Sequence, residues 1–354
     1  MADFTQYGHA TAEWLAVTDS RPPIPGHLDL KEMQRLTNMY REQLAQSEME
    51  KLKDYPILMN DYTVTSRDGF PLEVRTYRPA SAKEGARLPI YIHLHGGGYV
   101  FGNIPSEDAI CTRIAVMTNV TVVNLNYRHA PDYAYPTAWE DTVDAFHWVH
   151  DHIDELLGVP SQVVVGGISA GAQLAASLTL RQNIAPDALS RPKLAGQVLM
   201  IPALVHPDCY APIMEQMKEP SLSSYVQNAE APMINKAALD KFTGLLKVQN
   251  PDPKDVRLNI GLATVEQLKN MPPSTLGICG LDPLRDEALF YGQKLVEAGR
   301  VPTDVHVFNG LPHGFRRFGD QLAESRRWDK VMEDGIKWAL SKPEPSGKFE
   351  IKLE

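Results

Sequence analysis

The pentapeptide Gly167-Ile168-Ser169-Ala170-Gly171 restricts the fold of this chain more than any other feature of its sequence. The apolar run at residues 162–165 predicts a strand before it, and the small and apolar residues 170–180 predict a helix after it. A strand that turns sharply into a helix through G-x-S-x-G is the setting that raises a serine above a sheet as a nucleophile. Such a turn favours residues without a Cβ, because it needs unusual backbone angles and close approach to neighbours.

Three other interpretations of this pentapeptide compete with a nucleophile. The match could arise by chance, and the serine could simply cap the helix. A dinucleotide-binding loop also joins a strand to a helix through glycines. That loop fits poorly here, because the middle glycine of G-x-G-x-x-G would fall on Ile168 and Arg191 stands where a ribose-binding acid is expected.

A second glycine-rich motif lies upstream, at the end of another predicted strand. Residues 89–94 form an apolar run that leads into H-G-G-G at residues 95–98. Glycines let backbone N–H groups approach a ligand oxygen unobstructed, and acyl transfer needs such donors where negative charge develops. A plain glycine-rich turn is the alternative interpretation, but H-G-G-G and G-x-S-x-G are known as partners in hydrolases.

Acidic residues follow a third predicted strand at residues 274–280. Asp282 lies at the carboxyl end of that strand and is the preferred acid of a catalytic triad. Asp286 and Glu287 compete for the role but fall a turn inside the next predicted helix. Asp282 could also cap that helix with Pro283 as its first residue, and the two roles are compatible.

A histidine in a loop completes the set. His313 follows the predicted strand 304–308 in a position from which an imidazole can reach a serine, whereas His306 lies inside that strand and is expected to be structural. The order Ser169, Asp282, His313 is the order of nucleophile, acid and base in α/β hydrolases. The signals together predict a serine nucleophile activated by a histidine.

Strands and helices alternate after residue 88, which predicts a mainly parallel sheet covered by helices on both faces. Further strands are predicted at 121–126 and 195–201, and helices at 137–157, 284–297 and 321–340. Strands at 62–65 and 72–77 flank an Asp-Gly turn and predict a hairpin. Two segments stand outside the alternation: residues 1–55, helical with a proline-rich break at 21–26, and residues 206–270.

These patterns divide the chain into a core and a cap. We expect the following segments: N-terminal cap helices at 1–55, a first core part at 56–205, a cap insertion at 206–270, a second core part at 271–345 and a tail at 346–354. A cap of this kind would close over Ser169.

Composition limits the partners. Lys and Arg total 35 against 44 Asp and Glu, and a net charge of −9 without a basic block disfavours nucleic acid and anionic membranes. No run of 18 apolar residues predicts a membrane span, and the N-terminus does not resemble a signal peptide. Three cysteines are too few for a disulfide framework and lack zinc spacing. We therefore expect reduced thiols in a cytoplasmic protein.

Other polar residues are given structural roles. The histidines and aspartates of residues 147–154 recur at helical spacing, which could place metal ligands on one face, but a solvated helix face is preferred. Arg128 is expected to form a structural ion pair or hydrogen bond, and His95 to hold the glycine loop rather than to transfer protons.

The chain resembles the hormone-sensitive-lipase-like family of α/β-hydrolase esterases over roughly residues 60–340. The resemblance rests on H-G-G-G at 95–98, G-I-S-A-G at 167–171, D-P-L-R-D at 282–286 and H-G-F at 313–315. Residues 127–132, Y-R-H-A-P-D, look like the Y-R-L-A-P-E segment of that family. Two positions depart from the usual pattern: Ile168 stands where Asp is common, and Ala172 where Gly is common.

The resemblance implies a function and a set of roles. It implies Ser169 as nucleophile, His313 as general base and Asp282 as the group that orients the histidine. It implies an oxyanion hole from the backbone N–H groups of Gly97, Gly98 and Ala170. The expected enzyme is a serine carboxylesterase for small, short-acyl esters, without metal or cofactor.

Several alternatives stay open. The same triad could cleave an amide, lactone or thioester, or could serve a dehydratase or cyclase of a biosynthetic pathway. A non-catalytic small-molecule receptor on the same fold, as in plant gibberellin receptors, is disfavoured because such receptors lack the triad histidine. A homodimer is also left open.

Overall fold

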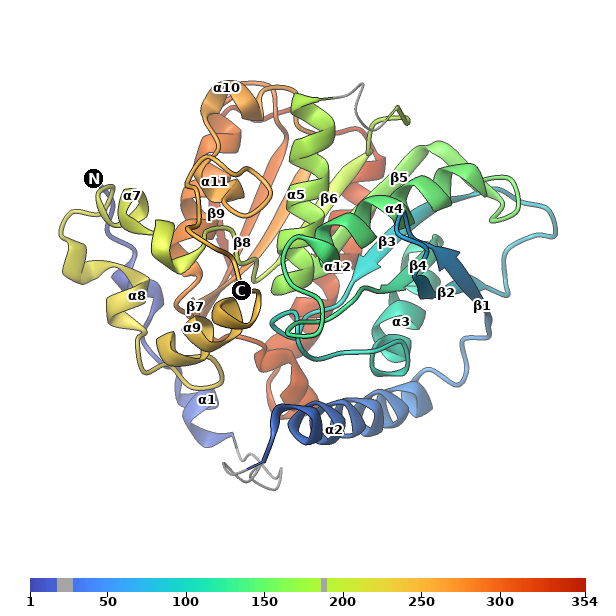
Figure 1. The fold of residues 1–354 in the computed structure, drawn as a ribbon, viewed down its shortest axis with the longest axis horizontal. Coiled ribbons are helices and arrows are strands. Elements are labelled where there is room, and N and C mark those ends of the chain that lie inside the picture. Colours follow the sequence, from blue (N-terminus) through green and yellow to red (C-terminus); the bar gives the residue numbers. More distant parts are fainter. Residues whose placement is uncertain (18–27, 186–189) are drawn as a thin grey trace.

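The computed structural model describes residues 1–17, 28–185 and 190–354. A nine-stranded sheet in the order β1-β2-β4-β3-β5-β6-β7-β8-β9 runs through this part of the chain (Figure 1). Its strands are β1 (Ile57–Thr65), β2 (Pro71–Pro79), β3 (Leu88–Leu94), β4 (Thr121–Asn126), β5 (Gly158–Ile168), β6 (Gly196–Met200), β7 (Ser274–Leu281), β8 (Thr303–Pro312) and β9 (Ile351–Leu353).

The sheet is parallel from β4 to β9 and antiparallel only around β2. β1 and β2 form the predicted hairpin around the Asp-Gly turn, with Val64 paired to Leu72. Adjacent residues of β3 enter separate core clusters: Ile90 and Ile92 lie in one, and Tyr91 in the other. Both faces of the strand are therefore buried, which is why its sequence is a continuous apolar run rather than an alternating one.

Helices cover both faces of the sheet. α3 and α12 pack on one face, and α4, α5 and α11 on the other (Figure 1). The helices of four or more residues are α1 (Ala12–Ala16), α2 (Leu30–Lys51), α3 (Asp108–Thr118), α4 (Thr137–Asp151), α5 (Ala170–Ile184), α7 (Ala211–Met214), α8 (Ser224–Gln227), α9 (Lys236–Leu245), α10 (Val265–Leu268), α11 (Arg285–Glu297) and α12 (Glu324–Leu340). Short 3₁₀ turns are η1 (Thr5–Tyr7), η2 (Pro105–Glu107), η3 (Pro207–Cys209), η4 (Pro220–Leu222), η5 (Ile260–Leu262) and η6 (Phe315–Gln321).

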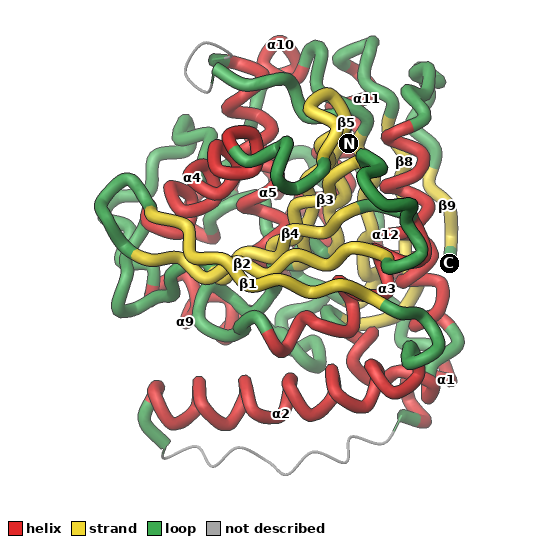
Figure 2. Tube along the Cα trace, turned by 90° about the vertical axis from the view of Figure 1, so that its right-hand side faces the viewer, coloured by secondary structure: helices red, strands yellow, loops and turns green. Residues whose placement is uncertain are grey.

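The two segments outside the alternation lie at different places around the core. α7, α8 and α9 gather on one side, while α2 runs along another, below the sheet in the view of Figure 2. α2 contacts η2 and α3, next to the loop that follows β3. The predicted proline-rich break at 21–26 lies outside the described residues.

Some elements differ from the sequence pattern. The helix predicted over 137–157 ends at Asp151, because a turn closed by the Gly158 N–H and the Ile153 carbonyl leads directly into β5. The sequence pattern gives no prediction for α3, although its buried residues follow helical spacing. The predicted tail contributes β9, which pairs with β8.

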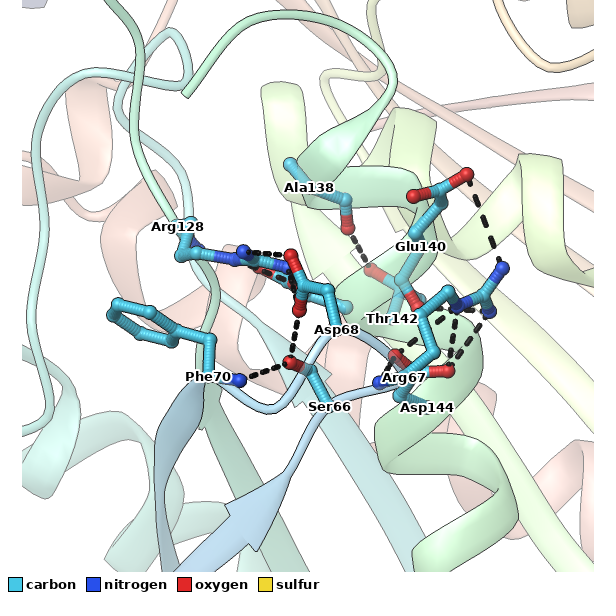
Figure 3. A network of polar contacts seen from close by, with 10 residues as sticks. Ser66, Arg67, Asp68, Phe70, Arg128, Ala138, Glu140, Thr142 and Asp144 are labelled. Carbon is cyan, nitrogen blue, oxygen red and sulfur yellow. Dashed lines mark hydrogen bonds and ion pairs between the residues drawn. The ribbon is translucent and has the colours of Figure 1, made fainter. Parts of the chain in front are cut away.

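Arg128 ties the hairpin turn to the helix layer, as a structural ion pair should. Its guanidinium donates to Asp141, 2.6 Å away at the closest. It also donates to Asp68, 2.6 Å away (Figure 3). The neighbouring Arg67 donates to Asp144 of α4 at 2.8 Å. The structural interpretation of Arg128 is confirmed.

No described helix is both long and apolar enough to cross a bilayer. Cys111, Cys209 and Cys279 are buried and form no disulfide with one another.

Candidate active site

Ser169 occupies a strained turn between β5 and α5. Its φ and ψ are 56° and −117°, a conformation that side-chain-bearing residues adopt only when the surroundings enforce it. The surroundings do so here, because its N–H donates to the Met200 carbonyl of β6 at 2.8 Å and α5 begins at the next residue. The hydroxyl is thereby held at the carboxyl end of the sheet, and Ser169 as a whole is only 8% exposed.

Gly171 explains why the two glycine motifs occur together. A Cβ at this position would lie 2.0 Å from the Leu94 carbonyl oxygen and 2.5 Å from that of His95. The first turn of α5 therefore rests directly on the end of β3, where the H-G-G-G loop starts. Any larger residue would push the serine turn and the glycine loop apart.

His313 connects Ser169 to Asp282. Its Nε2 lies 2.9 Å from Ser169 Oγ, and its Nδ1 lies 2.7 Å from Asp282 Oδ2. The three residues follow β5, β7 and β8, so their side chains meet at the carboxyl edge of the parallel sheet. All three are more than nine-tenths buried.

The competing acids point to other partners. Asp286 accepts hydrogen bonds from the Ser224 N–H at 2.6 Å and from Arg285 Nε at 2.8 Å. Glu287 accepts from the N–H groups of Leu204 and Val205, and burial raises its pKa well above the ordinary value. The structure thus brings only Asp282, of these three acids, to His313.

Asp282 does not cap α11 in the predicted way. The helix starts at Arg285, so Pro283 is not its first residue. Asp282 Oδ1 instead accepts from the Leu284 N–H at 2.9 Å and closes the turn before the helix. This bond fixes one carboxylate oxygen while the other faces the histidine.

The H-G-G-G loop presents free amide groups beside the serine. Gly97 and Gly98 have φ of 133° and 62°, and among the described residues their N–H groups donate to no backbone carbonyl. A Cβ on Gly97 would lie 2.1 Å from the Phe101 carbonyl oxygen, so the tight turn requires glycine. Ala170, as the first residue of α5, has an N–H outside the helical ladder.

α2 holds this loop from outside. Arg41 Nη1 donates to the Gly96 carbonyl at 3.0 Å, and Asn38 Oδ1 accepts from the Gly102 N–H at 2.8 Å. Gln34 Nε2 donates to the Val100 carbonyl at 3.0 Å. The sequence pattern did not single out these three polar residues. Their spacing of four and three residues places them on one helix face. This spacing is the sequence signal from which a polar contact face on the helix could have been predicted.

His95 lies under the loop and is unsuited to proton transfer at neutral pH. Its ring stacks on Tyr127 at 4.3 Å between centroids, and its Nδ1 lies 3.1 Å from the Gly96 carbonyl oxygen. Complete burial lowers its pKa to about 4, so the imidazole stays neutral. This environment fits the expected loop-holding role.

A narrow apolar cavity of about 40 Å³ opens beside Ser169. Gly98 and Ala170 lie in its wall, and residues from the 206–270 segment form much of the remainder. Phe242 of α9 lies in this wall against the H-G-G-G loop, since a Cβ on Gly98 would be 2.8 Å from its ring. No described residue of 1–55 lines the cavity.

The described residues hold no group of three or more His, Cys, Asp or Glu side chains arranged for a metal ion. The metal interpretation of residues 147–154 therefore gains no support. The preferred solvated face was wrong for His150, which is 9% exposed and packs on Phe146 at 4.8 Å between centroids. Burial lowers the pKa of His150 to about 4. The imidazole lies in the core because the apolar stripe of α4 includes its position.

A serine on a strand–helix elbow, followed by an acid and a histidine after later strands of a parallel sheet, defines an α/β hydrolase. Residues 91–317 match the model of a protein family whose description is 'alpha/beta hydrolase fold'. The chain belongs to the hormone-sensitive-lipase-like family of α/β hydrolases, and it is an enzyme of the carboxylesterase type.

Known relatives support this membership. The chain is 32% identical to Esterase LipI of Mycobacterium tuberculosis over 249 residues, 69% of this chain and 71% of the relative. It is 32% identical to Ethyl acetate hydrolase of Pseudomonas putida over 273 residues, 77% of this chain and 80% of the relative. Its structure matches that of Vibralactone Cyclase with a TM-score of 0.81 at 25% identity, covering 95% of this chain and 96% of the other.

Proposed function

We propose that this chain is a serine carboxylic-ester hydrolase that acts on small esters with short acyl chains through an acyl-enzyme. The observation that carries the proposal is the position of His313, within hydrogen-bonding distance of both Ser169 Oγ and Asp282 Oδ2. A serine hydroxyl is a weak nucleophile until a neighbouring base takes its proton.

The proposed reaction has two halves. Ser169 Oγ attacks the acyl carbonyl while His313 Nε2 takes the hydroxyl proton and then gives it to the leaving alcohol. Water attacks the acyl-enzyme in the second half, with His313 again acting as base. Asp282 keeps the proton on Nδ1 and stabilises the imidazolium that forms.

The backbone amides of Gly97, Gly98 and Ala170 are proposed as the oxyanion hole. Two of these residues line the cavity beside Ser169, and the glycine amides make no backbone hydrogen bond among the described residues. Donors already fixed in place stabilise the developing oxyanion without reorganising during the reaction.

The cavity supports a short, apolar acyl group. A cavity of about 40 Å³ has room for only a few water-sized groups, since each needs roughly 10–15 Å³. The Pseudomonas putida relative is named for the hydrolysis of ethyl acetate, a small ester. The 206–270 segment supplies much of the wall and is proposed as a cap insertion. The 1–55 segment is proposed as its N-terminal part.

A cyclase or lactone-directed reaction is the second candidate. The similarity to Vibralactone Cyclase favours it, because the two structures align over almost the whole length of both chains. Such an enzyme would use the same Ser169–His313 pair but pass the acyl group to an internal nucleophile instead of water. A receptor function is disfavoured by the presence of His313.

A substrate screen and a covalent label test the proposal. p-Nitrophenyl esters of two to eight carbons, long-chain esters, lactones and anilides should be compared. A fluorophosphonate should be used to locate the reactive residue by peptide mass spectrometry. We expect the highest kcat/KM on short esters and a label on Ser169, both insensitive to chelators. Faster turnover of lactones would favour the second candidate, and a label elsewhere would falsify the triad.

A further inference from the structure

The loop that carries Asp282 receives hydrogen bonds from the 206–270 segment rather than from the sheet alone. β7 and β8 change register between Cys279 and Leu281, so the regular ladder is interrupted where the acid loop begins. We define the acid loop as residues 280–284. Arg285 supplies part of what its carbonyl groups need: the Arg285 N–H donates to the Asp282 carbonyl at 3.1 Å, and Arg285 Nη1 donates to the Gly280 carbonyl at 3.3 Å. Further donors come from the 206–270 segment, as expected where buried backbone acceptors are rarely left unpaired.

Asn228 and Ser224 supply those donors. Asn228 Nδ2 donates to the carbonyl oxygens of Asp282 at 2.9 Å and of Gly280 at 3.2 Å. Ser224 Oγ donates to the Pro283 carbonyl oxygen at 2.6 Å. Three of the five carbonyls of the acid loop are thus held by two side chains, one from α8 and one directly after it.

The burial of these side chains indicates that the donors are required there. Asn228 is 1% exposed and Ser224 is fully buried. Asn228 Oδ1 has no hydrogen-bond partner among the described residues. The side-chain amide is therefore buried although its oxygen gains no hydrogen bond there. Because both neighbouring groups are carbonyls, the NH₂ end of the amide must face the loop.

The same short helix makes two further contacts around the acid loop. The Ser224 N–H donates to Asp286 at 2.6 Å, and Gln227 Oε1 accepts from Arg285 at 2.6 Å. Asp286 and Arg285 directly follow the acid loop at the start of α11. The loop is therefore held on both its carbonyl side and its C-terminal side by α8 and Asn228.

We propose that Asn228, assisted by Ser224, is a positioning residue for the reaction: it holds the Asp282 main chain so that the carboxylate meets His313. This inference rests on the proposed function, because it acts through the Ser169–His313–Asp282 set. Neither side chain touches a reacting atom. A displacement of about 1 Å in a supporting group can lower a rate about 100-fold.

The test compares Asn228→Ala with Asn183→Ala. Asn183 also donates through Nδ2 to two carbonyls, those of Gln267 and Lys269, but near the far end of α5 from Ser169. Asn228→Ala is expected to lower kcat about 10- to 100-fold with KM within about threefold. Asn183→Ala should lower only the unfolding temperature. Equal kcat in the two variants would overturn the inference.

A double-mutant cycle separates positioning from general destabilisation. If Asn228 acts through Asp282, Asn228→Ala should cost less than about threefold when added to Asp282→Asn. If Asn228→Ala lowers kcat by the same factor in the Asp282→Asn variant as in the wild-type protein, Asn228 does not act through Asp282. Should Asn228→Ala fail to fold, Ser224→Ala decides: a lower kcat at unchanged KM is expected, and wild-type kcat would overturn the proposal.

The rate of fluorophosphonate labelling keeps the two proposals distinguishable. Labelling of Ser169 depends on the triad and not on the ester class, so it reports on Asn228 even if the substrate class is wrong. Wild-type labelling with equal rates in both asparagine variants would refute the positioning role alone. An unlabelled, inactive wild-type protein would refute the proposed function and this inference with it.

Discussion

At the scale of single residues, the side chains of the candidate triad have defined partners. Ser169 faces His313 Nε2, while the Asp282 carboxylate divides its two oxygens between His313 and the Leu284 N–H. This division matters because a carboxylate held by a backbone donor keeps one orientation toward the imidazole. Substitutions at these positions should change chemistry more than stability.

Asp282→Asn is expected to lower kcat about 10⁴-fold, because an asparagine amide favours the wrong imidazole tautomer. Asp304→Asn is the matched control, since Asp304 also pairs with a histidine, His306 Nε2 at 3.0 Å, on strand β8. The control should keep kcat within about threefold on a short p-nitrophenyl ester. Comparable losses in both variants would remove the assignment of Asp282.

His129→Leu is expected to stabilise the protein, most of all in acid. Burial lowers the pKa of His129 to about 3, below its ordinary value of 6.5, so the folded state binds fewer protons than the unfolded state. Stability from this group is present above pH 6.5 and is lost as pH falls toward 3. Among the described residues its buried Nε2 also lacks a hydrogen-bond partner.

Thermal unfolding at two pH values measures this effect. Removing the imidazole should add about 2 kcal/mol more to the free energy of unfolding at pH 5 than at pH 8. The same gain at both pH values would mean that His129 does not remain neutral in the folded protein.

At the scale of elements, α9 and α2 approach the H-G-G-G loop from different sides. Phe242 of α9 lies against Gly98 within the cavity wall, whereas Asn38 and Arg41 of α2 bind the loop backbone. The first element limits the space for the acyl group. The second fixes the loop whose amides are proposed to bind the oxyanion.

Phe242→Ala is expected to shift the preference toward longer acyl chains. Removing the ring enlarges the cavity beside Ser169, so kcat/KM for p-nitrophenyl octanoate should rise about 10-fold relative to that for p-nitrophenyl acetate. The size of the effect follows because one methylene group in an apolar pocket changes kcat/KM by about 10-fold or more. Leu245→Ala on the same helix is the control, because Leu245 does not line the cavity. An unchanged ratio in Phe242→Ala would exclude this ring as the limit on chain length.

At the scale of the whole molecule, distant segments complete the site. The N-terminal residues pack on the ends of β7 and β8: a Cβ on Gly280 would lie 1.9 Å from the Tyr7 carbonyl oxygen, and a Cβ on Gly310 would lie 2.1 Å from the His9 carbonyl oxygen. The N-terminal segment therefore packs on the ends of the two strands that lead to Asp282 and His313. Its described residues hold the site from outside and do not line the cavity.

Deleting residues 1–45 is consequently expected to lower kcat about 10-fold or more while leaving the acyl-chain preference within about twofold. Circular dichroism and thermal unfolding should first show that the truncated protein is folded. Asn38→Ala should reproduce part of the loss, and Gln46→Ala, an exposed position on the same helix, should not. An unchanged kcat with a relaxed preference would instead mean that this segment limits the space for the acyl group.

The sequence by itself determined the α/β class, the elbow at Ser169 and the order of the three candidate triad residues. Each depends on a local pattern: an apolar strand, a glycine where no Cβ fits, and a polar residue where a strand ends. Such patterns can be recognised in the sequence because backbone geometry repeats within a few residues. The motif order also sufficed to place the chain within its hydrolase family.

The sequence preferred Asp282 but left Asp286 and Glu287 as competitors, and the tertiary structure decided among them. Only the tertiary structure showed which residues bound the cavity and what holds the loops of the candidate site. Asp282 and Asp286 are separated by only four positions in the sequence, yet Asp282 faces His313 and Asp286 faces Ser224. Asn228 reaches a loop more than fifty residues away, at an angle fixed by how the 206–270 segment folds over the sheet. Contacts of this range depend on the relative placement of whole elements, which no local periodicity encodes.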